Sequence, residues 1–395
     1  MATVYEAPGV YVEEIPPVAR PIAGVGTSTA AFIGVADRLA TADNGKPHKF
    51  TNWQEFATFL KGPTPTDTTP IFTSLNRRLA LAVFGFFNNG GTSCYVVPVP
   101  AAADMADLTA PLLTLEPIDE IAIVAAPGVE DTVRKVQILD HCFTMEDRVA
   151  LLDGVLAPAS DSTPADIYGG AMPTGGPTTP DKFSYGAIYF PWVKVLNPLW
   201  TQGGTEPKVI DQPPSGHVAG IWARVDGTRG VHKAPANETV NGIVDVERAI
   251  SKAKQKSLNP DGINVIRSFG GAQMVYGART LGGKRNGEYT YLNVRRFMNF
   301  LKESIDEGTQ FVVFEPNNPA LWQRIIRSVS DFLYNQWRDG ALFGETAKQA
   351  FFVKCDAETN PSSTREAGQV ITEIGVAVTK PAEFVIFRIQ QTTGS

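Results

Sequence analysis

The residues of this chain that could carry chemistry are few, and their spacing matches no complete phosphate-binding motif. The glycine-rich run GARTLGGKR (277–285) resembles a phosphate loop, but Ala278 stands where the first glycine belongs. In the same run Arg285 replaces the Ser or Thr that would bind magnesium. Gly24-Val25-Gly26 lacks the third glycine of a dinucleotide-binding turn. Both runs therefore predict tight turns.

The histidines and cysteines also fail to form a site. No two of them stand at the short spacings of a metal site, and no CxxC pair occurs. They are His48, His141, His217, His232, Cys94, Cys142 and Cys355. We therefore expect no metal, no cofactor and no disulfide, and we expect the three thiols to be buried and free.

A hydrolytic triad is the one catalytic arrangement that needs an explicit test. Gly26-Thr27-Ser28 beside an α/β middle suggests a subtilisin-type protease, whose catalytic order is Asp, His, Ser. Here Ser28 precedes every Asp and His of the chain. Glu13 and Glu14 are adjacent on an extended segment, so their carboxylates point to opposite faces. We predict no catalytic residues and no enzyme activity, and a degenerate α/β hydrolase stays as an alternative.

Composition narrows the functional class. The 395 residues carry a net charge of −6, which excludes a generically basic nucleic-acid binder. Charged residues make up only 19%, below the roughly 25% of ordinary soluble domains, so we expect other copies to cover much of the surface. The longest apolar run, around 79–87, is too short to span a membrane. The first residues, MATVYEAPGVYVEE, lack the pattern of a signal peptide, so we expect synthesis in the cytoplasm and no membrane insertion.

The helices and strands that must position these residues fall into two regions with different sequence patterns. Apolar runs alternate with helical patterns through the middle, which predicts a parallel sheet covered on both faces. The expected strands are 94–99, 121–128, 148–153 and 187–195, the expected helices begin at 52, 71 and 130, and 159–182 and 201–217 are expected surface loops. After about 263 we expect turn-separated strands, a helix over 294–305, a strand over 311–316, a helix from Pro319, and strands over 350–356, 374–380 and 383–390. The fold class is therefore α/β plus α+β.

Several long stretches resemble the sheath proteins of contractile bacteriophage tails and of extracellular contractile injection systems. They lie at both ends and in the middle: APGVYVEE (7–14), RPIAGVGTSTAAFIG (20–34), PPSGHVAGIWARVDGTRGVHKAPANE (213–238), LNPDGINVIR (258–267), GARTL (277–281), NVRRF (293–297), VFEPNNPALW (313–322), FLYNQWRDGALFG (332–344), VKCDAETN (353–360) and PAEFVIFRIQQ (381–391).

The resemblance implies a mechanical protein with four segments. It implies an N-terminal extended arm (1–22), a variable outer α/β domain that is subtilisin-like without the active site (23–265), a conserved inner α+β domain (266–380) and a C-terminal extended arm (381–395). Copies of such proteins stack as hexameric rings in a six-start helix around an inner tube, contract, and drive the tube through a target envelope. Baseplate and terminal cap proteins are the further implied partners, with assembly in the bacterial cytoplasm into a phage tail or a released injection particle.

Strand physics suggests how copies hold together. An extended arm that cannot bury its own backbone gains a ladder of hydrogen bonds when it joins a neighbour's sheet edge. We expect flexible arm roots near Pro16-Pro17 and Lys380-Pro381. The candidate arm residues are Val4, Val10, Val12, Phe384, Ile386 and Ile389. The alternative is that both arms complete their own domain.

The inner tube needs a contact that can release, and weak surface charge pairs repeated in every copy would serve. Polar faces of the two C-terminal helices carry the candidates Arg324, Arg327, Arg338, Arg295, Arg296 and Lys302. Solvated faces with local ion pairs, such as Arg327 with Asp331, are an equal alternative. A non-contractile virion shell protein is the remaining alternative for the whole chain.

Overall fold

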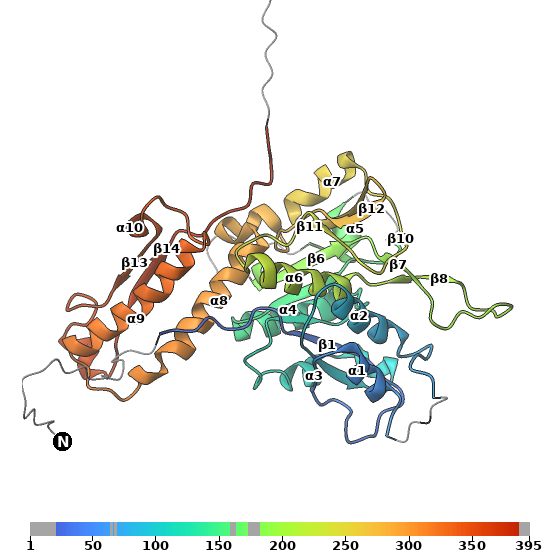
Figure 1. Ribbon diagram of the computed structural model, residues 1–395, viewed down its shortest axis with the longest axis horizontal. Helices are drawn as coiled ribbons and strands as arrows, with labels where there is room; N and C mark the ends of the chain where they lie inside the picture. The colour runs from blue at the N-terminus through green and yellow to red at the C-terminus, as the bar shows by residue number, and fades with distance from the viewer. Residues whose placement is uncertain (1–20, 64–65, 67–68, 159–162, 173–181, 387–395) are drawn as a thin grey trace, which may run out of the picture. The chain divides into compact units, whose positions relative to one another are not determined.

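The computed structural model describes the chain from 21 to 386 except for 64–65, 67–68, 159–162 and 173–181. Val4, Val10, Val12 and Ile389 of the expected arms therefore lie outside the described residues. The chain divides into two compact units (Figure 1). Of the described residues, the smaller unit comprises 21–23 and 304–377, and the larger comprises the remainder, from 24 to 303 and from 378 to 386.

A nine-stranded sheet forms the centre of the larger unit. Its strand order is β2-β3-β1-β4-β5-β6-β11-β12-β9, and the six strands from β3 to β11 run parallel. The bounds are β1 Ala30–Val35, β2 His48–Phe50, β3 Cys94–Val99, β4 Ile123–Ala125, β5 Val149–Asp153, β6 Gly186–Phe190, β9 Glu238–Thr239, β11 Ile263–Phe269 and β12 Ala272–Val275. The predicted parallel sheet is present, with antiparallel strands at both edges.

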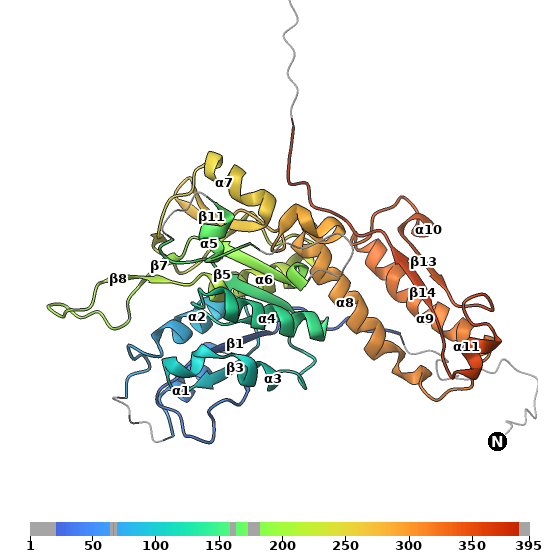
Figure 2. The ribbon, with the colours of Figure 1, turned by 180° about the vertical axis from the view of Figure 1, so that it is seen from behind.

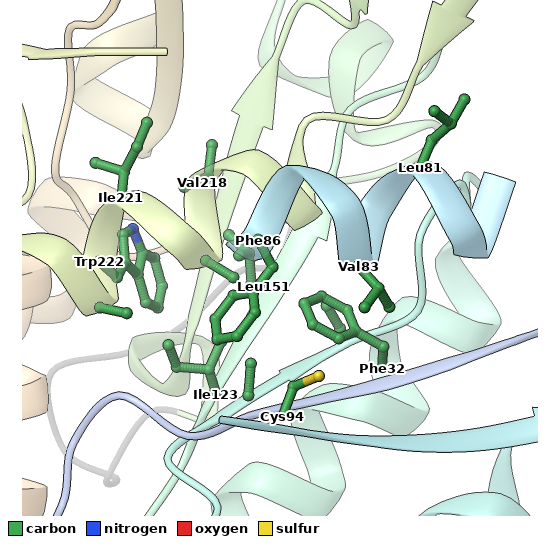
Figure 3. Close-up of a cluster of buried hydrophobic side chains, with 14 of the residues drawn as sticks. Phe32, Leu81, Val83, Phe86, Cys94, Ile123, Leu151, Val218, Ile221 and Trp222 are labelled. Carbon is green, nitrogen blue, oxygen red and sulfur yellow. The ribbon is translucent and has the colours of Figure 1, made fainter. Parts of the chain in front are cut away.

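Helices cover both faces of this sheet because successive strand residues point to opposite sides. Ala30 and Phe32 face one apolar layer, whereas Ala31 and Ile33 face the other. The first layer holds α1 (Trp53–Leu60), α2 (Arg77–Asn88) and α6 (Ser215–Arg229); the second holds α3 (Thr109–Leu113), α4 (Thr132–Met145), α5 (Pro164–Tyr168) and α7 (Lys252–Leu258). Figure 3 shows side chains of α2 and α6 meeting those of the strands in the first layer. The thiols of Cys94, Cys142 and Cys355 are buried and free, as predicted.

Three expectations for this unit are wrong. The region 159–182 is not only a surface loop, because it contains α5, whose Ile167 and Tyr168 are buried. The region 201–217 is not only a surface loop either, because it contains β8 (Val209–Gln212) and the start of α6. Strand β8 pairs with β7 (Val193–Leu196), which pairs with β10 (Asp245–Val246), so a small second sheet forms here. Helix α2 begins at Arg77 instead of 71, since Thr73 and Asn76 exchange hydrogen bonds in a turn before it.

Helices α2 and α6 approach so closely that glycine is required at their contact. A Cβ atom at Gly216 would lie 2.2 Å from the carbonyl oxygen of Ala82, and one at Gly220 would lie 2.3 Å from that of Phe86. Both partner atoms belong to the backbone of α2 and cannot turn aside. The Gly-x-x-x-Gly spacing places the two glycines on one face of α6, which lets the backbones touch.

We expect Gly216→Ala and Gly220→Ala each to lower the free energy of unfolding by about 3 kcal/mol, because the helices must move apart. Gly227→Ala on the same helix is the matched control. A Cβ at Gly227 meets no atom within 4 Å, so that change should be neutral or stabilise by up to about 1 kcal/mol. Urea unfolding of the three variants measures the difference. Equal effects at all three positions would contradict the close-contact explanation.

The smaller unit is built on helix α9 (Pro319–Arg338) and the antiparallel pair β13 (Phe351–Lys354) and β14 (Glu373–Val376) (Figure 2). The apolar face predicted for α9 is buried at Leu321, Trp322, Ile325, Val329 and Leu333. The short helix α10 (Ala347–Ala350) directly precedes β13, and α11 (Ser362–Glu366) lies between β13 and β14 in sequence. The strand expected over 311–316 is absent: a single 3-10 turn, η5 (Gln310–Val312), occupies its start.

The boundary between the units falls inside helix α8 (Leu292–Thr309), between Glu303 and Ser304. The expected boundary between 265 and 266 falls inside β11 instead, and β11 is paired with β6 in the large sheet. The change of sequence texture near 263 therefore marks the hairpin of β11 and β12 at the end of the parallel strands and not the end of the unit.

Candidate interaction surfaces

Glu383, at the root of the C-terminal arm, is held by the larger unit. Its carboxylate accepts hydrogen bonds from Arg279 Nε at 3.0 Å and Nη2 at 2.6 Å, and from the Tyr291 hydroxyl at 3.0 Å. The side-chain amide of Asn259 donates a further bond. The Arg279 side chain is only 3% exposed and that of Glu383 is 21% exposed. We call this cluster the Glu383 clamp.

The hydrogen bonds and the positive charge in the Glu383 clamp favour the ionised form of Glu383. Burial opposes the ionised form of Glu383, but the hydrogen bonds from Arg279 and Asn259 and the Arg279 charge outweigh it and lower the pKa of the carboxyl. Burial and the bond to Glu383 raise the pKa of Tyr291, so its hydroxyl stays a donor at neutral pH. The arm is therefore fixed at 383, three residues beyond the flexible root expected near Lys380-Pro381.

The clamp joins three stretches that stand far apart in the sequence. Asn259 lies in LNPDGINVIR, Arg279 in GARTL and Glu383 in PAEFVIFRIQQ. Sequence reasoning missed the cluster, since it treated each stretch separately. The sequence did offer one signal. Arg279 and Glu383 carry opposite charges, and each lies within a stretch that resembles the sheath proteins.

Beyond the clamp the arm is exposed. Phe384 is 68% exposed and Ile386 is 77% exposed, with Val385 at 70% between them. Three consecutive large apolar side chains in water are costly unless a partner covers them. The two described arm candidates, Phe384 and Ile386, thus lie outside the core of their own chain.

The β13–β14 pair of the smaller unit has open edges. The register joins Phe351 to Val376 and Lys354 to Glu373, and within the described residues each strand has only this one neighbour. The backbone groups of the outer edges can therefore accept an added strand. Phe352 on this pair is 58% exposed.

The exposed face of α9 carries the first three tube-binding candidates. Arg327 and Arg338 are exposed and stand 11 residues apart, which is three helical turns and places them on one face. Arg324 is half-buried, donates to Glu315 at 2.6 Å and lies over the ring of Phe311. Arg324 is therefore already paired within its own unit.

The candidates on α8 occupy different surroundings from those expected. Arg295 is buried between the rings of Tyr185 and Tyr289, at 4.1 and 3.5 Å, and donates to Ser184. Burial lowers the pKa of this guanidinium. Lys302 is exposed but donates to Glu146 at 2.6 Å. The polar face inferred for Arg295 is therefore an interior face.

Arg296 is also buried, and it joins three further matching stretches. It donates to Asp226 at 2.9 Å and to the carbonyl oxygen of Thr27, while the Thr27 hydroxyl donates to Asp226 at 2.7 Å. The Arg296 and Asp226 side chains are 3% and 5% exposed. Breaking such a buried pair costs about 3–5 kcal/mol, which assigns Arg296 to the stability of the larger unit instead of a surface contact.

The carboxyl end of the parallel strands holds a buried carboxylate that could be mistaken for a catalytic one. Asp153 accepts hydrogen bonds from the backbone N–H and the hydroxyl of Ser215, at 2.9 and 2.8 Å, and from the N–H of Gly128. Burial raises the pKa of Asp153 to about 6. Ser215 is fully buried and its hydroxyl is spent on this bond, so the pair caps the start of α6.

The described residues contain no group of three His, Cys, Asp or Glu side chains placed to hold a metal ion. Within the same part of the chain, no helix combines the length and apolarity needed to cross a bilayer.

Two domain models of one protein family match this chain. The model of the phage tail sheath protein central domain matches 96–281, and that of the phage tail sheath C-terminal domain matches 284–392. The tail sheath protein of Burkholderia phage BcepMu is 29% identical over 194 residues, which are 46% of this chain and 39% of that protein. The tail sheath protein of Vibrio phage KVP40 is 26% identical over 46% of this chain and 26% of its own length. The matches thus span well under half the length of these relatives.

Solved structures match over almost the whole chain. The helical sheath of the anti-feeding prophage in the contracted state has a TM-score of 0.75 and 28% identity, covering 98% of this chain and 100% of that one. The sheath complex of the extracellular contractile injection system PVC, also contracted, has a TM-score of 0.73 and 26% identity, covering 99% of both chains. With the two sheath domains matched in order along the sequence, the chain belongs to the contractile tail sheath protein family.

Proposed function

We propose that this chain is the structural subunit of a contractile sheath. Copies stack as hexameric rings in a six-start helix around an inner tube, and contraction drives the tube through a target envelope. The observation that carries the proposal is the match, over 98% of the chain, to a subunit solved within a contracted helical sheath. A baseplate and a terminal cap protein complete the particle, and a further match solved within a baseplate supports the first of these.

The larger unit is the outer domain in this proposal, with a subtilisin-like arrangement and no active site. The parallel sheet covered by helices on both faces supports the arrangement. The burial of Ser215 against Asp153 supports a structural use of the sheet's carboxyl edge. The particle assembles in the bacterial cytoplasm and becomes part of a phage tail or a released injection particle.

Strand exchange links the subunits. The exposed Phe384 and Ile386, with Ile389, belong to the C-terminal arm, and Val4, Val10 and Val12 belong to the N-terminal arm. The open edges of β13 and β14 are the receiving sites, one arm strand on each edge. A heterologous contact of this kind propagates along a helix instead of closing as a dimer.

Tube attachment belongs to the exposed face of α9. Arg327 and Arg338 supply the free positive charge, and Arg324 contributes when Glu315 releases it. Single exposed charge contacts are worth about 0–1 kcal/mol, which suits a grip that is repeated in every ring and released on contraction.

Electron microscopy of the purified full-length protein tests the function. We expect hollow cylinders of contracted sheath to form without nucleotide or metal, because the contracted state is the more stable one and the extended state needs a tube as template. Closed shells would favour a non-contractile virion shell protein. A clean monomer at high concentration would favour the degenerate hydrolase and contradict the proposal.

A further inference from the structure

Phe314 in the smaller unit combines two unfavourable features. Its side chain is fully exposed, more than any other large apolar residue of the described chain. Its backbone has a φ of +65°, in the left-handed region that side-chain-bearing residues avoid. The neighbouring Val313 is 56% exposed.

The local turn explains why the backbone is strained. The N–H of Glu315 donates to the carbonyl oxygen of Val312 at 3.1 Å, and Val313 has φ −65° and ψ 130°. These angles describe a type II turn, in which the third position requires a positive φ and is normally glycine. Phe314 occupies this third position. The chain therefore holds a bulky apolar side chain in water at a place where glycine or asparagine would relieve strain.

Strain of this kind persists where the surrounding structure and a function require it. The run FVVF at 311–314 has the composition of a strand but finds no strand partner within the described chain. A local preference that conflicts with the observed conformation marks sites at which function overrides folding.

The charges beside Phe314 indicate the class of partner. Glu315, the next residue along the chain, is paired with Arg324, which also covers the ring of Phe311. The tip of the turn, Val313 and Phe314, is apolar and exposed. Proteins matched over nearly the whole chain form helical sheaths from many copies, so a second copy is the partner that is always present. An apolar anchor inserted in a neighbour's pocket is also the usual source of interface affinity.

We propose that Phe314 is the apolar anchor of a contact between copies, and that it inserts into an apolar pocket on a neighbouring subunit of the sheath. The inference rests on the proposed function. Burying the ring on assembly offsets the backbone strain that each free subunit carries. Folding of the single chain would favour glycine or asparagine at this position, whereas assembly favours phenylalanine.

The test replaces Phe314 in the full-length protein with residues that separate strain from apolarity. Phe314→Gly and Phe314→Asn suit the turn but remove the anchor, whereas Phe314→Leu keeps an apolar side chain. We expect Gly and Asn to raise the protein concentration needed for sheath formation by about tenfold or more, while the thermal midpoint of the unassembled protein stays equal or rises. Leu should have a much smaller effect. Val133→Asn, a 67% exposed position on α4, controls for general surface polarity.

A photoreactive benzoylphenylalanine at 314 identifies the occupant. We expect crosslinks between differently labelled copies within assembled sheath. A crosslink confined to one chain, or to a tube protein only, would overturn the inference, as would unchanged assembly of Phe314→Gly. If the parent protein forms no sheath at all, the proposed function fails first, and that result is distinct from normal parent assembly with a normal Phe314→Gly variant.

Discussion

Reversing one partner of the Glu383 clamp is expected to abolish sheath assembly, and reversing both partners to restore a measurable part of it. Glu383→Arg places two guanidinium groups together at a site where Arg279 is 3% exposed, and Arg279→Glu does the same with two carboxylates. Loss of a largely buried pair costs about 3 kcal/mol, which lowers the docked fraction of arms by about a hundredfold. The double variant pairs the charges again in the opposite order.

The physical reason is that the arm can hold a neighbour only if its own root is fixed. The clamp binds the arm at 383, immediately before the exposed Phe384, Val385 and Ile386. If neighbours hold the arm beyond this point, tension on it passes through Glu383 into the large sheet. Without the clamp the root would extend before it transmitted any movement.

Sedimentation and microscopy measure assembly, and circular dichroism and thermal midpoints measure folding. Removal of 384–395 is the benchmark: it should leave a folded body that does not polymerise. Glu383→Gln keeps the shape and most hydrogen bonds, so it should assemble less well than the parent but better than Glu383→Arg. Normal sheath from Glu383→Arg would show that the clamp does not anchor the arm.

The sign of the clamp's pH dependence follows from its shift. The pKa of Glu383 lies below its ordinary value of 4.5 in the folded protein, so its stabilisation is complete above about pH 4.5. It is lost only as the pH falls through the lower folded value. The clamp therefore predicts no change in assembly between pH 6 and 8.

The parts of the fold that sequence predicted are those with one dominant signal. The strands at Cys94, Ile123 and Val149 are continuous apolar runs, and α9 has a single apolar face with a proline at its start. Helix α6 gave no such signal, because Gly216, Gly220 and surrounding apolar residues bury nearly all of its faces against α2 and the sheet. A helix buried on every side shows no periodicity.

The candidate surfaces were predicted less well because they depend on distant contacts. Helical spacing places Arg295 and Arg296 near a polar stripe, but only the folded chain shows Tyr289 and Asp226 closing over them. Likewise Arg279 and Glu383 are 104 residues apart. Exposure of Arg327 and Arg338 could be predicted, since their own helix supplies the opposing apolar face.

The second prediction with a large expected effect concerns the contact with the inner tube. If Arg327 and Arg338 hold an acidic tube surface, Arg327→Glu with Arg338→Glu should abolish tube-bound extended sheath and leave contracted polymer intact. Both residues are exposed on one face of α9, so the repulsion repeats in every subunit, and neither the arms nor the clamp is touched. Lys252→Glu with Lys256→Glu on the surface of α7 is the matched control with the same change of charge.

Salt separates this charge contact from the contacts between subunits. Raising the ionic strength should detach the parent sheath from its tube before it dissolves tube-free polymer, because exposed charges are screened and ladder hydrogen bonds are not. Cryo-microscopy of particles assembled with the double variant is the decisive measurement. Normal extended particles would exclude the α9 face and leave Lys302, exposed but paired with Glu146, as the remaining accessible candidate among the predicted cations. Arg295 and Arg296 are buried in the larger unit, so they could reach a tube only if that unit opened. Opening it would cost more free energy than a single surface charge pair contributes.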